Sequence, residues 1–320
     1  MSKDNYLNKA NDFSNKKLDE LITGLSASLT KEEFKTDFLK NICVYACGSL
    51  GRCELSEKSD LDLFFIYNKQ DSCSNLEKYR FFSKIYDVNK ELGFKDPSKG
   101  GGFWDLISKE NLVEIGSRNE DYNNSFTARL LLILESKPIF NIELYNNIVK
   151  DVVDAYFIDY KSHPSNFLPM YLINDILRYW FTLTLNYEHR RDDKDNKQTR
   201  YWKRLKLKFP RLLTCFSTLA CLYKKDIKPE DVIELTSKTP LERLSFAAGE
   251  NKKISSLVIE IEKKYNWFLS LTQENPSWWD IEENKKMAFK NADDFHELVV
   301  HKLLNEVSKG NIELKKRIEI

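Results

Sequence analysis

The sequence has no long apolar run. No stretch approaches the roughly 18 uninterrupted apolar residues of a membrane-spanning helix, and the N-terminal segment MSKDNYLNKANDFSNKK is polar, without the apolar centre of a signal peptide. These two absences predict a cytoplasmic protein with no membrane partner.

Paired cysteines and an excess of charge of one sign are also missing. The six cysteines are scattered without a CxxC pair, which argues against a disulfide scaffold or a structural zinc site and favours reduced thiols. The net charge is only +1. No overall attraction to nucleic acid or to an anionic membrane is therefore expected, and such a partner would need a local patch of charge.

What the sequence does contain is material for a packed core. Apolar residues make up 42% of the chain and aromatic residues 13%, so the chain is not disordered. Its 320 residues suit one large domain or two of ordinary size. Strand signals are concentrated in the first part and helical periodicity dominates later. We expect an α+β protein with a small mixed β-sheet and flanking helices over residues 1–150, followed by an all-α helical bundle over 151–320.

The first domain is predicted to run helix, strand, strand, helix, strand. Thr30 and Glu33 have the spacing of a capping box, which predicts that a helix begins there. The fully apolar run 42–47 predicts a buried strand. Further elements are expected as strands at 61–67 and 103–107 and as a helix at 76–92. After Ser125 only helices are expected, with an interruption near Pro210.

The most informative residues are Asp60 and Asp62, which stand at the start of the second predicted strand. Residues two apart on a strand project from the same face, so both carboxylates point one way while Leu61 and Leu63 point into the core. Two adjacent carboxylates repel each other unless a cation lies between them. Hard oxygen ligands at this spacing suit Mg²⁺ or Mn²⁺, and Mg²⁺ usually shares its coordination shell with substrate phosphates.

Gly48 and Ser49 follow the preceding strand directly. Glycine lets the backbone approach a phosphate closely, and the hydroxyl and following N–H groups can hold the outer phosphates. Arg52 lies in the connection to the second strand and can add a charge-assisted contact. Either pair alone is common in turns and strand starts, but the combination between two apolar strands is specific for a nucleoside triphosphate on a divalent metal.

The segment GSLGRCELSEKSDLDL, which begins at Gly48, resembles the active-site signature of the polymerase-β-like nucleotidyltransferase superfamily. Its Gly-Arg-x-Glu-Leu portion is most similar to the branch of the bacterial uridylyltransferases of nitrogen signalling, the PII-uridylyltransferases. Weaker similarity to predicted nucleotidyltransferases related to that branch continues through residues 124–140 and 173–188.

The resemblance implies that Gly48 and Ser49 contact the nucleotide phosphates and that Asp60 and Asp62 hold the metal. It also implies a third catalytic carboxylate on a later strand, which helps to deprotonate the attacking hydroxyl. The candidate is Asp105, with Asp96 and Glu114 as rivals.

A basic segment follows in the predicted helical domain. Residues 189–211 are rich in Lys and Arg, with Tyr201 and Trp202 among them. Lys203 and Arg204 are the candidates for a contact with the triphosphate, and a solvated helix face is the alternative. His296 and His301 are five residues apart, a spacing that does not align two ligands on an α-helix. We expect these two histidines to be structural or solvated.

These features predict a transferase. A Mg²⁺- or Mn²⁺-dependent nucleotidyltransferase would bind ATP or another NTP, move the NMP to a hydroxyl of a protein, a tRNA or other RNA, or a small molecule, and release pyrophosphate. Two alternatives remain open. One is a catalytically weak nucleotide sensor on the same fold, and the other is a toxin or defence nucleotidyltransferase acting on RNA.

Overall fold

The computed structural model describes residues 5–30, 33–68, 74–97, 101, 104–116, 124–165, 167–189 and 197–318. The chain forms two compact units. One comprises Leu7–Ile158 together with Val232–Ser237, and the other comprises Asp159–Asp231 and the residues from Lys238 on, together with the described residues Asn5 and Tyr6. The chain therefore returns briefly to the first unit before it completes the second.

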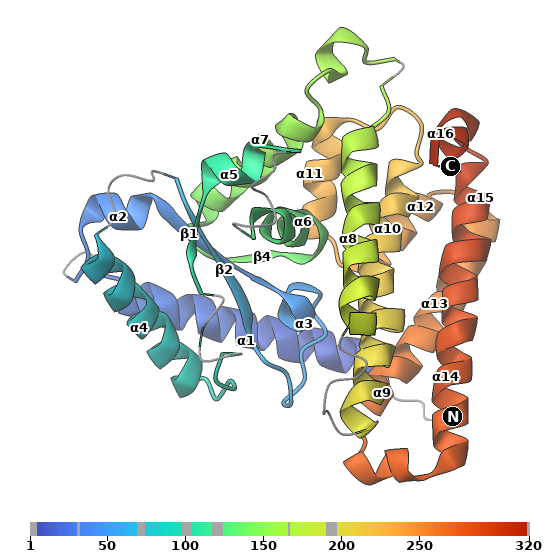
Figure 1. Ribbon diagram of the computed structural model, residues 1–320, viewed down its shortest axis with the longest axis horizontal. Coiled ribbons are helices and arrows are strands. Elements are labelled where there is room, and N and C mark those ends of the chain that lie inside the picture. The colour runs from blue at the N-terminus through green and yellow to red at the C-terminus, as the bar shows by residue number, and fades with distance from the viewer. Residues whose placement is uncertain are drawn as a thin grey trace. The chain divides into compact units, whose positions relative to one another are not determined.

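The first unit is built on a small mixed sheet (Figure 1). The described strands are β1 (Ile42–Cys47), β2 (Asp62–Tyr67), β3 (Leu106–Ser108) and β4 (Lys137–Phe140), in the order β3-β2-β1-β4. β1 pairs antiparallel with both β2 and β4, whereas β3 pairs parallel with β2. The predicted α+β class with a small mixed sheet is confirmed.

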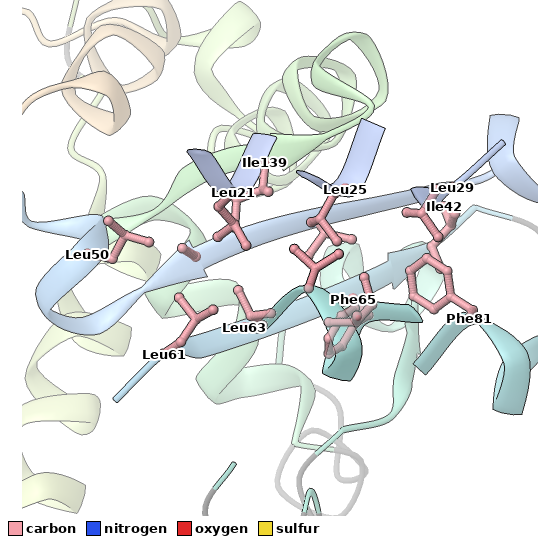
Figure 2. Close-up of a cluster of buried hydrophobic side chains, with 14 of the residues drawn as sticks. Leu21, Leu25, Leu29, Ile42, Leu50, Leu61, Leu63, Phe65, Phe81 and Ile139 are labelled. Carbon is pink, nitrogen blue, oxygen red and sulfur yellow. The ribbon is translucent and has the colours of Figure 1, made fainter. Parts of the chain in front are cut away.

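β1 is buried along its whole length because helices cover both faces of the sheet. Alternate residues of β1 and β2 join a core with α1 (Tyr6–Ser28) and α4 (Asn75–Glu91). Figure 2 shows Leu21 and Leu25 of α1 directed at this face of the strands. On the other face, Tyr45 stacks on Phe64 and its hydroxyl donates to the Ala128 carbonyl at 2.8 Å.

Several of the remaining helices of this unit are short. They are α2 (Thr36–Lys40), α3 (Gly48–Gly51), α5 (Lys109–Val113), α6 (Ser125–Glu135), α7 (Ile142–Tyr156) and most of α11 (Pro229–Ser237). The helix predicted to begin at Thr30 is wrong, because α2 starts at Thr36. The Thr30 carbonyl instead closes a turn by accepting from the Phe34 N–H at 3.1 Å, and Phe34 packs against Phe38. A capping box does form at Ser74 and Glu77, where α4 begins.

β4 is an element that the sequence did not predict. Its segment, Lys-Pro-Ile-Phe, is short, and Pro138 marks it as a poor strand by composition. β4 nevertheless pairs with β1 at the edge of the sheet, where a missing N–H is tolerated, and Ile139 is buried in the core. β4 therefore forms because of its long-range contacts and not because of its local composition.

In the second unit the described residues form helices and turns without a strand, as predicted. Its helical segments include α8 (Met170–His189), α9 (Lys197–Lys206), η4 (Leu207–Arg211), α10 (Leu212–Leu222), α12 (Pro240–Ala248), α13 (Lys252–Leu271), α14 (Glu282–His296), η6 (Glu297–Leu303), α15 (Leu304–Ser308) and α16 (Ile312–Ile318). Pro210 does not end the helix. It lies in the wide π-helical turn η4 between α9 and α10, which accommodates a residue without an N–H. Among the described helices, none is long and apolar enough to cross a membrane.

Candidate functional site

The end of β1 and the start of β2 lie side by side. Antiparallel pairing makes Cys47 and Asp62 cross-strand partners, so Gly48, the next residue, is brought against the Asp62 side chain. Gly48 has φ +65, and a Cβ built on it would lie only 2.5 Å from Asp62 Oδ2. Glycine is therefore required both by the left-handed backbone and by the carboxylate that occupies the side-chain space.

The two predicted metal ligands keep the expected alternation. Asp62 opens β2 and Asp60 precedes the strand, and both side chains are exposed. Leu61 and Leu63 are each 6% exposed and belong to the core. Two exposed carboxylates are thus held by apolar neighbours that cannot leave the core without loss of burial.

The connection between the two strands is attached to the core and to α1. Leu50 and Leu55 are buried in the same core (Leu50 is labelled in Figure 2). The Leu55 N–H donates to Ser14 Oγ of α1 at 2.8 Å. Within the connection, the Glu54 N–H donates to the Ser49 carbonyl at 2.7 Å. The Gly48–Gly51 turn, which is α3, is therefore fixed rather than loosely attached, with Ser49 half-buried at its start.

Arg52 is engaged by two carboxylates. Its Nε lies 2.8 Å from Glu54 Oε2 and its guanidinium lies 2.6 Å from Glu135 Oε2, and all three side chains are less than 10% exposed. The other Glu135 oxygen accepts from the Gly48 N–H at 3.1 Å. The contact of Arg52 with a phosphate stays a prediction, while its ion pairs join α6 to the turn.

This group of charges shifts the pKa of the Cys47 thiol. Its pKa is raised well above the ordinary value, first by burial and then by the carboxylates of Asp62 and Glu135, with Arg52 opposing. Burial and the neighbouring carboxylates therefore favour the neutral form of the thiol. The described cysteines, at positions 43, 47, 53, 215 and 221, carry free thiols. Cys73 lies outside the described residues.

Asp105, the predicted third carboxylate, immediately precedes β3. It forms an ion pair with Lys78 of α4, and its side chain is 70% exposed. Because Leu106 pairs with Phe65, the register places Asp105 two residues further along the sheet than Asp62 and one strand across, roughly 8 Å between their backbones. Across the described parts of the chain, no group of three or more His, Cys, Asp or Glu could hold a metal ion. The catalytic role of Asp105 stays a prediction.

The remaining candidates belong to the second unit. Lys203 and Arg204 lie on α9, and the Arg204 guanidinium is 4.3 Å from the centre of the Phe289 ring. Their contact with a nucleotide stays a prediction.

The spacing argument for the two histidines does not hold. His296 and His301 flank or lie within the π-helical segment η6, whose wider turn brings residues five apart together. Their ring centres are 5.4 Å apart.

Glu135 is the residue that the sequence analysis missed. It lies at the end of α6, where the sequence predicted only a helix. Its one local signal is a carboxylate inside the run LLLILES, because a buried charge requires a partner. Comparison with known proteins assigns no family: no protein-family model matches the chain, and no curated protein matches it.

Proposed function

We propose that this protein binds a nucleoside triphosphate with a divalent metal at the Gly48–Asp62 junction and transfers the NMP to a hydroxyl of an acceptor. The observation that carries the proposal is the close approach of Gly48 to Asp62, which is one of two exposed carboxylates, Asp60 and Asp62. In this arrangement the backbone of the turn lies beside the Asp62 carboxylate, with no side chain at Gly48 between them. A metal held by the carboxylates could then also be coordinated by the phosphate oxygens of a nucleotide on the turn.

The donor set fits Mg²⁺ or Mn²⁺. Asp60 and Asp62 offer hard oxygen ligands, both exposed, whereas the nearby Glu54 and Glu135 are buried and paired with Arg52. Asp60 and Asp62 would hold the metal, which when bound would stabilise negative charge on the phosphates of the substrate. The Ser49 N–H and hydroxyl would hold the outer phosphates and orient the leaving pyrophosphate.

The remaining step is removal of the proton from the attacking hydroxyl. The resemblance assigns this step to a third carboxylate, and Asp105 is the candidate. Its side chain is 70% exposed, which leaves it accessible to an acceptor. Any of the three acceptor classes, a protein, an RNA or a small molecule, is compatible with these residues.

A nucleotide sensor is the second candidate, and one observation favours it. Within the described residues Asp105 pairs with Lys78, and no third ligand joins Asp60 and Asp62. A site with two carboxylates can bind an NTP and its metal yet transfer the nucleotide slowly.

Metal-dependent pyrophosphate release distinguishes the two. Each of the four NTPs is supplied with Mg²⁺ or with EDTA, in the presence of cell extract as the source of acceptor. A transferase releases pyrophosphate and labels an acceptor when radiolabelled NTP is used, and the activity is lost in Asp60→Ala and Asp62→Ala. Asp87→Asn, an exposed carboxylate on α4, is the matched control and should retain activity.

Other outcomes separate the alternatives. Tight NTP binding without pyrophosphate release supports the sensor. Labelled tRNA supports a toxin or defence enzyme acting on RNA, whereas a labelled protein counts against it. Absence of both NTP binding and pyrophosphate release overturns the proposal. In crystals with Mn²⁺ and a nonhydrolysable NTP, metal within about 2.0–2.4 Å of both carboxylates is expected.

A further inference from the structure

Glu135 touches the candidate phosphate-binding turn with both its side chain and its backbone. The two carboxylate oxygens accept separately from the Gly48 N–H and the Arg52 guanidinium. The Glu135 carbonyl oxygen lies so close to Gly51 that a Cβ there would come within 1.8 Å of it. The end of α6 is therefore packed directly on the turn, with no side chain at Gly51 to separate them.

We propose that Glu135 is a positioning residue, which holds the Gly48–Gly51 turn in the form that binds the triphosphate. This inference rests on the proposed function. Glu135 does not itself contact a phosphate, because two anions repel each other. It acts through Gly48, whose N–H it fixes, and through Arg52, whose guanidinium it orients.

The burial of the contact favours positioning over competition. If Glu135 merely occupied phosphate donors until a nucleotide displaced it, its carboxylate would need an exit to solvent. Instead Glu135, Arg52 and Glu54 are each less than 10% exposed. The network continues into the turn itself, since the Glu54 N–H donates to the Ser49 carbonyl. A buried, fully paired charge is costly to displace.

The geometry also links Glu135 to the metal ligands. Gly48 engages both carboxylates: its N–H donates to Glu135, and Asp62 Oδ2 fills the space that a Gly48 side chain would take. A shift of the Gly48 backbone would therefore either collide with Asp62 or move away from it. Through this one glycine, α6 sets the relation between the phosphate-binding turn and the first residue of β2.

The decisive variant is Glu135→Gln in the full chain. A glutamine amide carries an acceptor oxygen at one position and a donor nitrogen at the other, so it cannot present an acceptor to both Gly48 and Arg52 where the two carboxylate oxygens now lie. We expect the affinity for NTP with Mg²⁺ to fall by about tenfold, the effect of one lost charge-assisted hydrogen bond. We also expect faster hydrogen exchange at the Gly48 amide, with little change in the middle of β1.

Glu77→Gln is the matched control. Glu77 is a comparably buried carboxylate in the same unit, but it caps α4. Its loss should lower the melting temperature without changing NTP affinity or exchange at Gly48. If Glu135→Gln does not fold, Glu135→Asp keeps the charge but withdraws the oxygens by one methylene, and should show the same two effects to a smaller degree.

The NTP affinity of Glu135→Gln distinguishes positioning from two other roles of the carboxylate. Tighter NTP binding in Glu135→Gln means that the carboxylate competes with phosphate, and unchanged binding in the folded variant means that it only supports the fold. Either result overturns the positioning role. If the unaltered protein binds no NTP, the proposed function fails. Exchange at Gly48 then still shows whether Glu135 holds the turn.

Discussion

Gly48 lies against the carboxylate of Asp62, and the space that a side chain would take is filled by Asp62 Oδ2 at 2.5 Å from the ideal Cβ position. This contact joins the end of one buried strand to the start of its antiparallel neighbour. This contact distinguishes the junction from an ordinary turn, and the proposed nucleotide site depends on it, because it places the Gly48 backbone directly beside a carboxylate oxygen.

Gly48→Ala is expected to impair both stability and binding. The left-handed φ of +65 costs a non-glycine residue roughly 1–2 kcal/mol, and the methyl group must also displace Asp62. Gly93→Ala is the control, since Gly93 has φ +76 but no atom within 4 Å of its Cβ position. Urea unfolding and NTP titration should show a stability loss for both variants, but weaker NTP binding for Gly48→Ala alone. Equal binding by the two variants would contradict the site.

Asp105→Asn tests the third carboxylate. A general base contributes about 10²- to 10⁴-fold to a rate, so we expect pyrophosphate release to fall by about 100-fold or more while NTP affinity is unchanged. Lys78→Gln removes the ion-pair partner of Asp105 but leaves the carboxylate, and should retain most activity. Full activity in Asp105→Asn would show that Asp105 is not the catalytic carboxylate and only pairs with Lys78. Asp96 and Glu114 would then be the candidates.

Arg52→Met is expected to destabilise the first unit. It would leave Glu54 and Glu135 buried without their shared cation, and breaking a buried ion pair costs about 3–5 kcal/mol. Lys84→Met removes an ion pair with Glu33 that is much more exposed, and should cost about 1 kcal/mol or less. The free energy of unfolding in urea compares the two. A loss for Arg52→Met as small as that for Lys84→Met would show that the buried pair is not stabilising.

The stability of the second unit should depend on His296. Burial, followed by Lys208 and His301, lowers the pKa of His296 below its ordinary value of 6.5. The folded state therefore favours the neutral ring, so its stability is fully present above pH 6.5 and is lost as the pH falls through the lowered pKa. Unfolding measured from pH 8 to pH 5 should show this decline, and His296→Gln should reduce it. His189→Gln, at the exposed end of α8, should leave the decline unchanged.

The candidate site could be predicted as far as it is local. Gly48, Ser49, Asp60 and Asp62 are close in sequence, and the alternation of Asp60 and Asp62 with Leu61 and Leu63 follows from the two-residue period of a strand. The apolar run of β1 likewise identifies a strand covered on both faces. A capping box was less reliable, because the Thr30 pattern formed a turn whereas the Ser74 pattern opened α4.

Only the tertiary structure decided what lies beside these residues. β4 forms because β1 offers it an edge, despite Pro138. Glu135 reaches Gly48 from 87 residues away in the sequence, and His296 meets His301 because a π-helical turn changes the local period. Periodicity determines which face of an element a residue occupies. Which distant group meets that face is set by long-range packing. The sequence therefore determined the candidate residues Gly48, Ser49, Asp60 and Asp62, while the fold determined which groups hold them in place.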